Sequence, residues 1–494
     1  MSAVVRGRKP LQTASAHRLL AATSLVGACG LLLYRIAPDV GGKPLYEDEA
    51  VAGLISMRPL GEVLDTVIAD RGGAPLHFLL AHSVFWVDAS ADALRWLSIV
   101  CALAAVPVCF DLGRRLAGTA AGVVAAVVVA SSTALAVYGS FGRMYALYVL
   151  VAALAADLFV RAREVRTRAA VAAAAAAFWL LPAVHPYGLI PALVALAIAA
   201  VLWRRRSLGD ALPVAVAVLA SIPFVLADLR LANRSEVGES GSALASPGDA
   251  WSELVAAVSS FAGGNGVALV LFTALAIAGI AVLASRSPAV AVLAAAVAVP
   301  PVLFVLVPAG SEPDLSPRHL FYGLPLWAAA IGVGVAWLRR WMPDRAWFVV
   351  VAAVVAGAVV APVSALRDPR ELGLLPTKTP DGVRAGAGEL LFPYATPFLA
   401  GIGDVRDALA LPQGPSDQIL RTLEHADEPI RAIHVAVPQE EWEVVTIRGP
   451  FDKEGALLAA ADAIAESPHP PELDWWYALI ERGLRAATLP RRGR

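Results

Sequence analysis

Charged residues are scarce in this sequence. Of its 494 residues, 16% are charged and 58% are hydrophobic, and the mean hydropathy is +0.66. A soluble globular chain averages about 25% charged and about 45–50% apolar residues. The composition therefore predicts a membrane protein and argues against a soluble one.

Cysteine is rare, and there is no excess of positive charge. The three cysteines, Cys29, Cys101 and Cys109, all lie in apolar runs, so the sequence predicts neither a disulfide framework nor a metal-ligand spacing. The formal net charge is −1. No basic stripe stands out either, and nucleic acid is not a predicted partner.

Long apolar runs predict an all-α polytopic membrane protein, because a spanning helix needs about 20 mostly apolar residues. The first run has no small-residue cleavage site after it, so we interpret it as an uncleaved span rather than a signal peptide. By length and composition, about eleven spans are expected. Their approximate limits are residues 19–37, 93–112, 118–137, 145–162, 169–184, 187–203, 210–228, 266–285, 288–308, 320–338 and 347–364.

The Lys and Arg residues of the short loops predict the orientation. They gather in alternate loops, and basic loops stay in the cytoplasm. We therefore expect a multi-pass plasma-membrane protein with a cytoplasmic N-terminus. The longer loops at residues 37–92, 229–265 and 308–319 are then extracytoplasmic.

The tail after residue 364 has a different character, being polar, rich in proline and more charged. Apolar residues alternate at Ile433–Val437 and at Trp442–Ile447, as in strands, whereas Gly455–Glu466 and Asp474–Leu489 have helical patterns. We predict a transmembrane catalytic domain over residues 1–364 and a small α/β extracytoplasmic domain over 365–494. The apolar stretch Leu390–Ile402 is too short to span comfortably, and we expect it to be interfacial or buried.

The first long loop carries three consecutive carboxylates in Tyr46-Glu47-Asp48-Glu49-Ala50. Acidic residues favour a helix N-terminus, so a solvated acidic turn is one interpretation. The other is a general base, which must lie within hydrogen-bond reach of an attacking hydroxyl. The same loop continues with an expected interfacial helix at about Leu76–Val87, in which His77 is a candidate ligand for a lipid phosphate. Arg95, at the start of the second span, is expected to extend toward the headgroups.

Three other outer turns combine a cation or a histidine with an aromatic residue. Arginine matches phosphate oxygens well because its donors form a fork, and an aromatic ring can stack on a sugar. Each ring is equally compatible with the interfacial aromatic belt. The candidate substrate-binding residues are Arg143 with Tyr145, His185 with Tyr187, and Arg318 with His319.

The ordered series of motifs resembles the GT-C class of membrane glycosyltransferases, in particular the group with the protein O-mannosyltransferases and the lipid A aminoarabinose transferase. The motifs that carry this resemblance are Tyr46–Ala50, Gly73–Leu80, Ala93–Ser98, Gly113–Gly118 and Ser140–Leu147. The chain departs from the family pattern at Ala74-Pro75, where two prolines are usual, and at Arg318-His319, where Arg-Tyr is usual.

The resemblance implies an inverting transfer of a sugar, with mannose as the first guess, from a polyprenyl-phosphate donor. The acceptor would be a hydroxyl of a glycan, a glycolipid or a protein. It implies Asp48 as the base with Glu49 beside it, and Arg143, Arg318 and His185 as ligands of the donor phosphate. No cofactor is expected to be required; a divalent cation remains possible, although no ligand pattern demands one.

Two other functions stay open from the residues alone. A polymerase or ligase of lipid-linked glycans would also use outer loops rich in Arg and His. A transporter or flippase would place ionisable residues deep in the spans. Instead, Asp111, Asp157 and Asp228 lie near predicted span ends.

Overall fold

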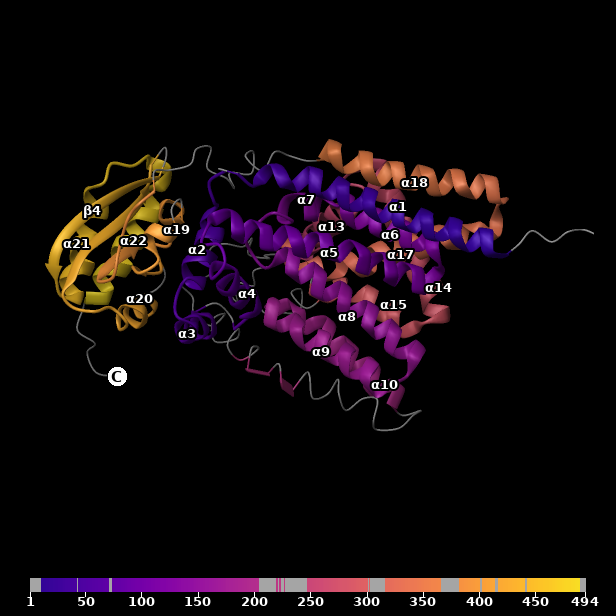
Figure 1. Ribbon diagram of the computed structural model, residues 1–494, viewed down its shortest axis with the longest axis horizontal. Coiled ribbons are helices and arrows are strands. Elements are labelled where there is room, and N and C mark those ends of the chain that lie inside the picture. Colours follow the sequence, from indigo (N-terminus) through magenta and orange to yellow (C-terminus); the bar gives the residue numbers. More distant parts are fainter. Residues whose placement is uncertain are drawn as a thin grey trace, which may run out of the picture.

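The computed structural model describes most of the chain as helices that run along one long axis, with a small sheet at one end (Figure 1). The described residues are 10–41, 43–70, 73–203, 219–220, 222–223, 226, 247–300, 302, 316–365, 382–399, 402–413, 416–439 and 442–488.

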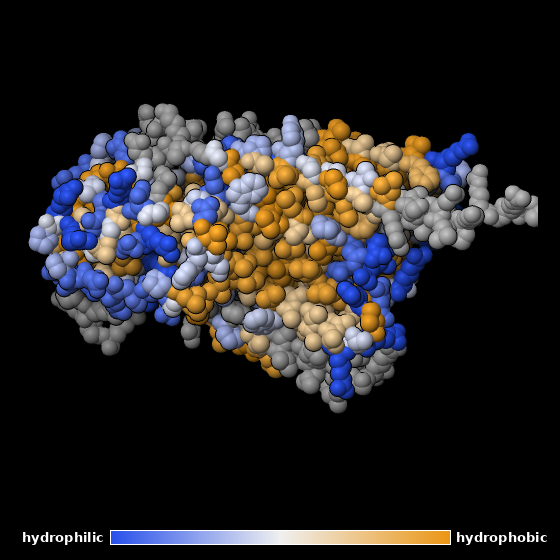
Figure 2. All heavy atoms as spheres, viewed as in Figure 1, coloured by the Kyte–Doolittle hydropathy of each residue, from blue (hydrophilic) through white to orange (hydrophobic). Residues whose placement is uncertain are grey.

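Six helical segments in this part of the chain are long and apolar enough to cross a membrane. Apolar side chains cover the middle of the helical body, and hydrophilic ones gather at its two ends (Figure 2). The chain is therefore a multi-pass membrane protein. The six segments contain α1 (Pro10–Ile36), α5 (Ala91–Ala117), α8 (Tyr145–Val165), α14 (Gly266–Arg286), α17 (Leu324–Leu338) with the preceding 3₁₀ helix η6 (Pro317–Gly323), and α18 (Asp344–Ala365).

The number of eleven spans stays a prediction. The other expected spans appear as shorter helices, and residues 210–228 lie mostly outside the described part of the chain. These shorter helices are α6 (Thr119–Ser131), followed by α7 (Thr133–Tyr138), and then α9 (Arg168–Val184), α10 (Leu189–Trp203) and α15 (Pro288–Ala295).

Small residues let the central helix α17 pack closely against its neighbours. A Cβ on Gly279 of α14 would lie 1.9 Å from the Ala330 carbonyl oxygen, and one on Gly332 of α17 would lie 2.4 Å from that of Ala121 in α6. Such close backbone approach is how helices associate in a membrane, where lipid tails are as apolar as leucine. α17 is thereby buried at the centre, and η6 is held at its N-terminal end.

The loop between α1 and α5 folds into three short helices, α2 (Glu47–Ser56), α3 (Leu60–Asp70) and α4 (Leu76–Phe85). α4 confirms the expected helix after the Gly-Pro turn. Within the second long loop lies a helix that the sequence pattern did not predict, α13 (Pro247–Phe261), which packs against η6.

The C-terminal α/β unit, which we define as residues 382–488, contains a four-stranded sheet in the order β2-β1-β3-β4. β1 (Glu389–Phe392) pairs in parallel with β2 (Leu409–Ala410) and with β3 (Ile430–Pro438), which is antiparallel to β4 (Trp442–Phe451). The remaining elements are η9 (Thr396–Leu399), α19 (Ile402–Val405), α20 (Ser416–Leu423), α21 (Lys453–Glu466) and α22 (Asp474–Thr488).

The structure confirms the strands and helices expected in the tail, namely β3, β4, α21 and α22. Of the apolar stretch Leu390–Ile402, residues 390–399 are buried and form β1 and η9 instead of a span. The short strands β1 and β2 were not predicted. The sheet unit lies beside α2, α3 and α4 at one end of the molecule (Figure 1).

Candidate functional site

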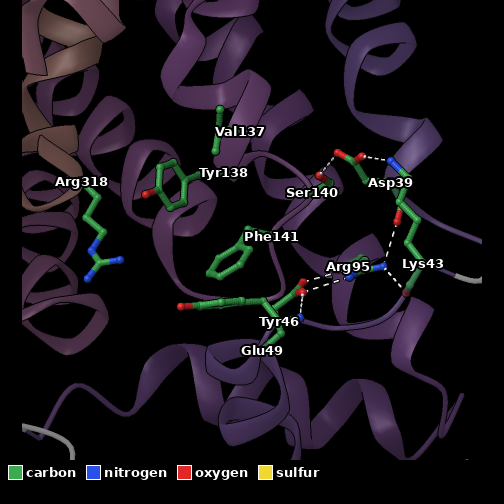
Figure 3. Close-up of a pocket in the computed structure, with 10 residues that line it drawn as sticks. All are labelled: Asp39, Lys43, Tyr46, Glu49, Arg95, Val137, Tyr138, Ser140, Phe141 and Arg318. Carbon is green, nitrogen blue, oxygen red and sulfur yellow. Dashed lines mark hydrogen bonds and ion pairs between the residues drawn. The ribbon is translucent and has the colours of Figure 1, made fainter. Parts of the chain in front are cut away.

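A cavity opens where the start of α2 faces α7, η6 and the turn at residues 139–144 (Figure 3). It encloses about 550 Å³, counting space that is open to solvent. Its lining combines charged groups with aromatic rings from segments far apart in the sequence. The lining residues are Asp39, Lys43, Tyr46, Glu49, Arg95, Val137, Tyr138, Ser140, Phe141 and Arg318.

One wall is a saturated ion pair between Glu49 and Arg95, whose side chains are 1% and 3% exposed. Arg95 uses all five of its donors, two on the Glu49 carboxylate at 3.1 and 2.9 Å and three on backbone carbonyls of residues 39, 43 and 44. Glu49 accepts two further bonds, from the amides of Tyr46 at 2.9 Å and Gly142 at 2.7 Å. The expectation that Arg95 extends toward the headgroups was wrong, because its guanidinium points inward to this carboxylate.

This network leaves Glu49 no lone pair for a substrate proton, since a carboxylate has about four acceptor positions and all are used. Glu49 instead joins the first turn of α2 to the turn at Gly142. A Cβ on Gly142 would lie 2.9 Å from the Leu94 side chain and 3.1 Å from Glu49 Oε1, so a side chain there would push the two apart. The geometry therefore does not support a catalytic role for Glu49.

His77 supports the same turn from behind. Its side chain is 1% exposed, and its Nε2 lies 3.2 Å from the Gly142 carbonyl oxygen. Burial and the nearby charge of Arg143 lower the pKa of His77 to about 3, so the neutral ring donates this hydrogen bond. The expectation that His77 faces a lipid phosphate does not match this position, because the ring is enclosed and is not part of the cavity lining.

Asp48 and Arg143 lie side by side at the other face of the first turn of α2. Arg143 Nη1 donates to the Asp48 backbone oxygen at 3.1 Å and lies 3.7 Å from Oδ1. The Asp48 side chain is 36% exposed, and no hydrogen bond to its carboxylate forms within the described residues. Over the same part of the chain, the buried Arg143 Nε has no hydrogen-bond partner. A substrate can therefore reach an acceptor oxygen on Asp48, whereas the unpaired Nε of Arg143 is itself buried.

The candidate residues from the later outer turns also come together. His185 lies 5.3 Å from His319 and 6.2 Å from Tyr145, measured between ring centroids. The ring of Tyr187 stacks on His319 at 4.7 Å, and Arg318 Cζ lies 5.8 Å from the centre of the Tyr145 ring. These residues come from α8, η2 (Pro186–Gly188) and η6, three elements far apart in the sequence.

Electrostatic effects show that the arginines and this ring cluster are neighbours. Burial lowers the pKa of His185 well below its ordinary value, and His319 lowers it further; the charges of Arg143 and Arg318 act in the same direction. Burial raises the pKa of Tyr46, nearby Asp48 raises it further, and Arg318 lowers it. Asp48 and Arg318 thus act on the Tyr46 ring, and Arg143 and Arg318 act on the His185 ring. In Figure 3, Arg318 lies across the rings of Tyr138 and Phe141 from the Glu49–Arg95 pair.

Sequence reasoning missed part of the cavity. Tyr138 and Phe141 form an aromatic wall with Tyr145, with ring centroids 4.9 Å apart for Tyr138–Tyr145 and 6.2 Å for Phe141–Tyr145. On the other side, Asp39 accepts bonds from Lys43 Nζ at 2.6 Å and from Ser140 Oγ at 2.7 Å. The position of Ser140 and Phe141 in the same turn as Arg143 was the available signal.

A metal site is not evident in the described ranges, where no three His, Cys, Asp or Glu side chains are grouped closely enough to hold an ion. At the opposite ends of the helices, acidic residues pair with arginines. Asp157 lies 3.2 Å from Arg115, and Asp111 lies 2.7 Å from the same side chain. Asp228 lies outside the described residues.

No protein-family model matches the sequence, and no curated protein matches it. Solved structures do resemble the chain. The archaeal oligosaccharyltransferase AglB from Archaeoglobus fulgidus, in complex with an inhibitory peptide and a dolichol-phosphate, has a TM-score of 0.46 at 11% identity, covering 85% of this chain and 69% of that one. ArnT from Cupriavidus metallidurans bound to undecaprenyl phosphate has a TM-score of 0.45 at 18% identity, covering 73% and 67%.

A third similar structure is the arabinosyltransferase EmbB from Mycobacterium smegmatis, with a TM-score of 0.38 at 15% identity, covering 67% of this chain and 32% of that one. The likeness to membrane glycosyltransferases that the motifs indicate thus also appears among solved structures. At these identities and TM-scores, it assigns neither an activity nor site residues to this chain.

Proposed function

We propose that this protein is an inverting glycosyltransferase that moves a sugar from a polyprenyl-phosphate donor to an acceptor hydroxyl on the extracytoplasmic side of the membrane. The observation that carries the proposal is the pairing of Asp48 with Arg143 beside the cavity. It joins a partly exposed carboxylate with open acceptor positions to a guanidinium, although the two residues are 95 positions apart in the chain.

In the proposed reaction, Asp48 accepts the proton of the acceptor hydroxyl as the oxygen attacks the anomeric carbon of the sugar. The new glycosidic bond forms while the bond from the anomeric carbon to the phosphate oxygen breaks. Polyprenyl phosphate leaves with the bonding electron pair. Attack from the face opposite the phosphate inverts the anomeric configuration. A positioned general base contributes about 10²–10⁴-fold to such a step.

Negative charge develops on the leaving phosphate, so cations that already face it stabilise the transition state more than the ground state. Arg143 and Arg318 are suited to this role because a guanidinium presents a fork of donors to phosphate oxygens. The neutral ring of His185 adds a donor without adding charge. Tyr46, Tyr138 and Phe141 line the cavity and supply faces against which a sugar can stack, whereas Tyr145 is buried and Tyr187 already stacks on His319.

The transporter alternative receives no comparable support. Transport sites place ionisable groups at mid-membrane depth. Among the described residues, the buried acid of α8, Asp157, is paired with Arg115 close to the cytoplasmic helix ends that the sequence predicts. This proposal also includes three expectations from the sequence: mannose as the sugar, the predicted orientation of the chain in the membrane, and a separate domain over residues 365–494.

Sugar transfer by the purified protein in nanodiscs tests the proposal. Radiolabelled polyprenyl-phosphate mannose, and then other polyprenyl-phosphate sugars, would be incubated with membrane acceptors. We expect labelled product from the wild type and at least about tenfold less from Arg318→Ala, because a charge-assisted phosphate contact is lost. Failure of the wild type to bind or to turn over any polyprenyl-phosphate sugar would contradict the proposal.

A further inference from the structure

The helix that carries Asp48 packs against two separate parts of the protein. One is the helical body, through Glu49 and Arg95. The other is the C-terminal α/β unit, which shares a buried apolar cluster with α2 and α4. Leu54 and Ile55 of α2 lie in this cluster together with Phe398 and Leu399 of η9.

Thr396 holds the start of α2. Its side chain is 2% exposed, and its Oγ1 donates to the backbone oxygen of Leu45 at 2.7 Å. The next residue, Tyr46, provides the carbonyl that accepts the first helical bonds of α2, from the amides of Glu49 at 2.9 Å and Ala50 at 3.0 Å. A hydroxyl of the C-terminal unit thus restrains the backbone three residues before Asp48, next to the carbonyls of residues 43 and 44 that Arg95 holds.

The middle and the end of α2 meet the same unit. At Gly53 there is no room for a side chain, because a Cβ would lie 2.6 Å from Leu399 Cδ1. Just after the helix, the buried Arg58 donates through Nη2 to the Tyr394 hydroxyl at 2.8 Å and also to the Ala410 backbone oxygen. No carboxylate pairs with Arg58 anywhere in the described ranges, so neutral acceptors of the C-terminal unit carry these bonds.

We propose that the C-terminal unit contributes to the catalytic site by restraining α2. Thr396 is the positioning residue that sets where α2 presents Asp48. Thr396 touches no substrate in this proposal and acts through the Leu45 carbonyl. The proposal rests on the proposed function for its kinetic consequence. Its structural claim, that the Thr396 hydroxyl restrains the first turn of α2, stands independently of any activity.

The test compares Thr396→Val, which keeps the shape but removes the donor, with Thr396→Ser, which keeps the donor. Hydrogen–deuterium exchange of the full-length protein in nanodiscs would report the amides of Glu47–Ser56. We expect these amides to exchange faster in the valine variant and at the wild-type rate in the serine variant. Exchange in α21, remote from this contact, should be the same in all three proteins and controls for general unfolding.

Kinetics give the second readout. A small displacement of a catalytic group costs up to about 10²-fold in rate, so we expect kcat to fall about tenfold in Thr396→Val. KM for the donor should stay within about twofold, because the phosphate ligands are untouched. Thr396→Ser should restore kcat. A general loss of folding would instead lower the amount of active protein and raise exchange throughout the chain.

If Thr396→Val does not fold, Tyr394→Phe serves as a second variant, because it removes one acceptor from Arg58 and leaves the packing intact. We expect it to speed exchange at the end of α2. Equal exchange of Glu47–Ser56 in the wild type and in folded Thr396→Val would overturn the positioning role of Thr396. Equal exchange at the end of α2 in Tyr394→Phe would overturn the claim that the C-terminal unit restrains this helix. Absence of sugar transfer by the wild type would overturn the proposed function alone and leave the exchange comparison valid.

Discussion

Two adjacent acids, Asp48 and Glu49, should respond in opposite ways to the same chemical change. In Glu49→Gln, the side chain keeps its shape, but one of its two oxygens becomes an NH₂ group. In one orientation of the amide, the NH₂ group faces the donors Arg95 Nε and the Gly142 amide. In the other orientation, it faces Arg95 Nη2 and the Tyr46 amide. The variant therefore loses two hydrogen bonds and leaves a buried guanidinium without its counter-charge.

The size of the effect follows from these contacts. A hydrogen bond to a charged group is worth about 1.5–3 kcal/mol, and breaking a buried ion pair from one side costs about 3–5 kcal/mol. We expect Glu49→Gln to lower the free energy of unfolding by about 3–5 kcal/mol. Asp48→Asn is the matched control, and we expect it to cost less than about 1 kcal/mol, because this partly exposed carboxylate lies 3.7 Å from its ionic partner.

Denaturant titration of the purified protein, with thermal melting alongside, measures both variants. A double variant with Arg95→Met separates pair energy from other effects, since Glu49→Gln should cost much less once the guanidinium is gone. Melting of Glu49→Gln like the wild type would contradict this prediction, and loss of sugar transfer in such a stable variant would assign Glu49 a role in the chemistry.

Three further changes probe other contacts. In the wild type, the His77 pKa of about 3 lies below the ordinary 6.5, so only the unfolded chain takes up this proton as the pH falls from about 6.5 to 3, and the stability of the fold drops over that window. Denaturation curves measured across pH should show a flatter dependence of stability on pH in His77→Gln. An unchanged dependence would contradict this prediction. Arg143→Lys keeps the charge but loses the fork of donors, so kcat/KM for the donor should fall at least about tenfold; an unchanged value would remove Arg143 from the phosphate site. Arg115→Gln leaves Asp157 without its ion pair at the far end of the helices. Melting should show that the free energy of unfolding falls by at least about 1 kcal/mol, while kcat stays unchanged. A large fall in kcat would contradict this and indicate coupling between the two ends.

Periodicity and composition predicted the helices that form the membrane body. Each long apolar run forms a whole helix, which is either buried in the protein or exposed to lipid. The strong alternation at Ile433–Val437 likewise predicted β3, which pairs with β1 on one side and with β4 on the other. The strands β1 and β2 escaped notice because they span four and two residues, too few to show a period. β1 pairs with β3, which lies about forty positions later in the chain, and β2 pairs with β1.

The candidate site was likewise predicted only in part from the sequence. Chemistry-bearing residue types at the outer ends of predicted spans pointed to Arg143, His185 and Arg318, and the fold brings these residues together. Residue type alone could not separate Asp48 from Glu49, because the difference lies in what each faces. A helix turns by about 100° per residue, so Glu49 points to Arg95 in the interior while Asp48 points to Arg143.

The enclosed position of His77 was equally hidden, because the partner that buries it is the carbonyl of Gly142, which lies 65 positions away. The contribution of the C-terminal unit depends on Thr396 meeting Leu45 across 351 positions. Neither contact leaves a local pattern in the sequence, since backbone carbonyls carry no residue-type signal.

The central claim is that Asp48 takes the proton from the acceptor hydroxyl. Single-turnover transfer by Asp48→Asn, with the labelled donor already bound, tests it most directly because binding and chemistry are separated. We expect donor binding like that of the wild type and transfer reduced by about 10²–10⁴-fold. Transfer at the wild-type rate with the donor bound would contradict the claim and require another base.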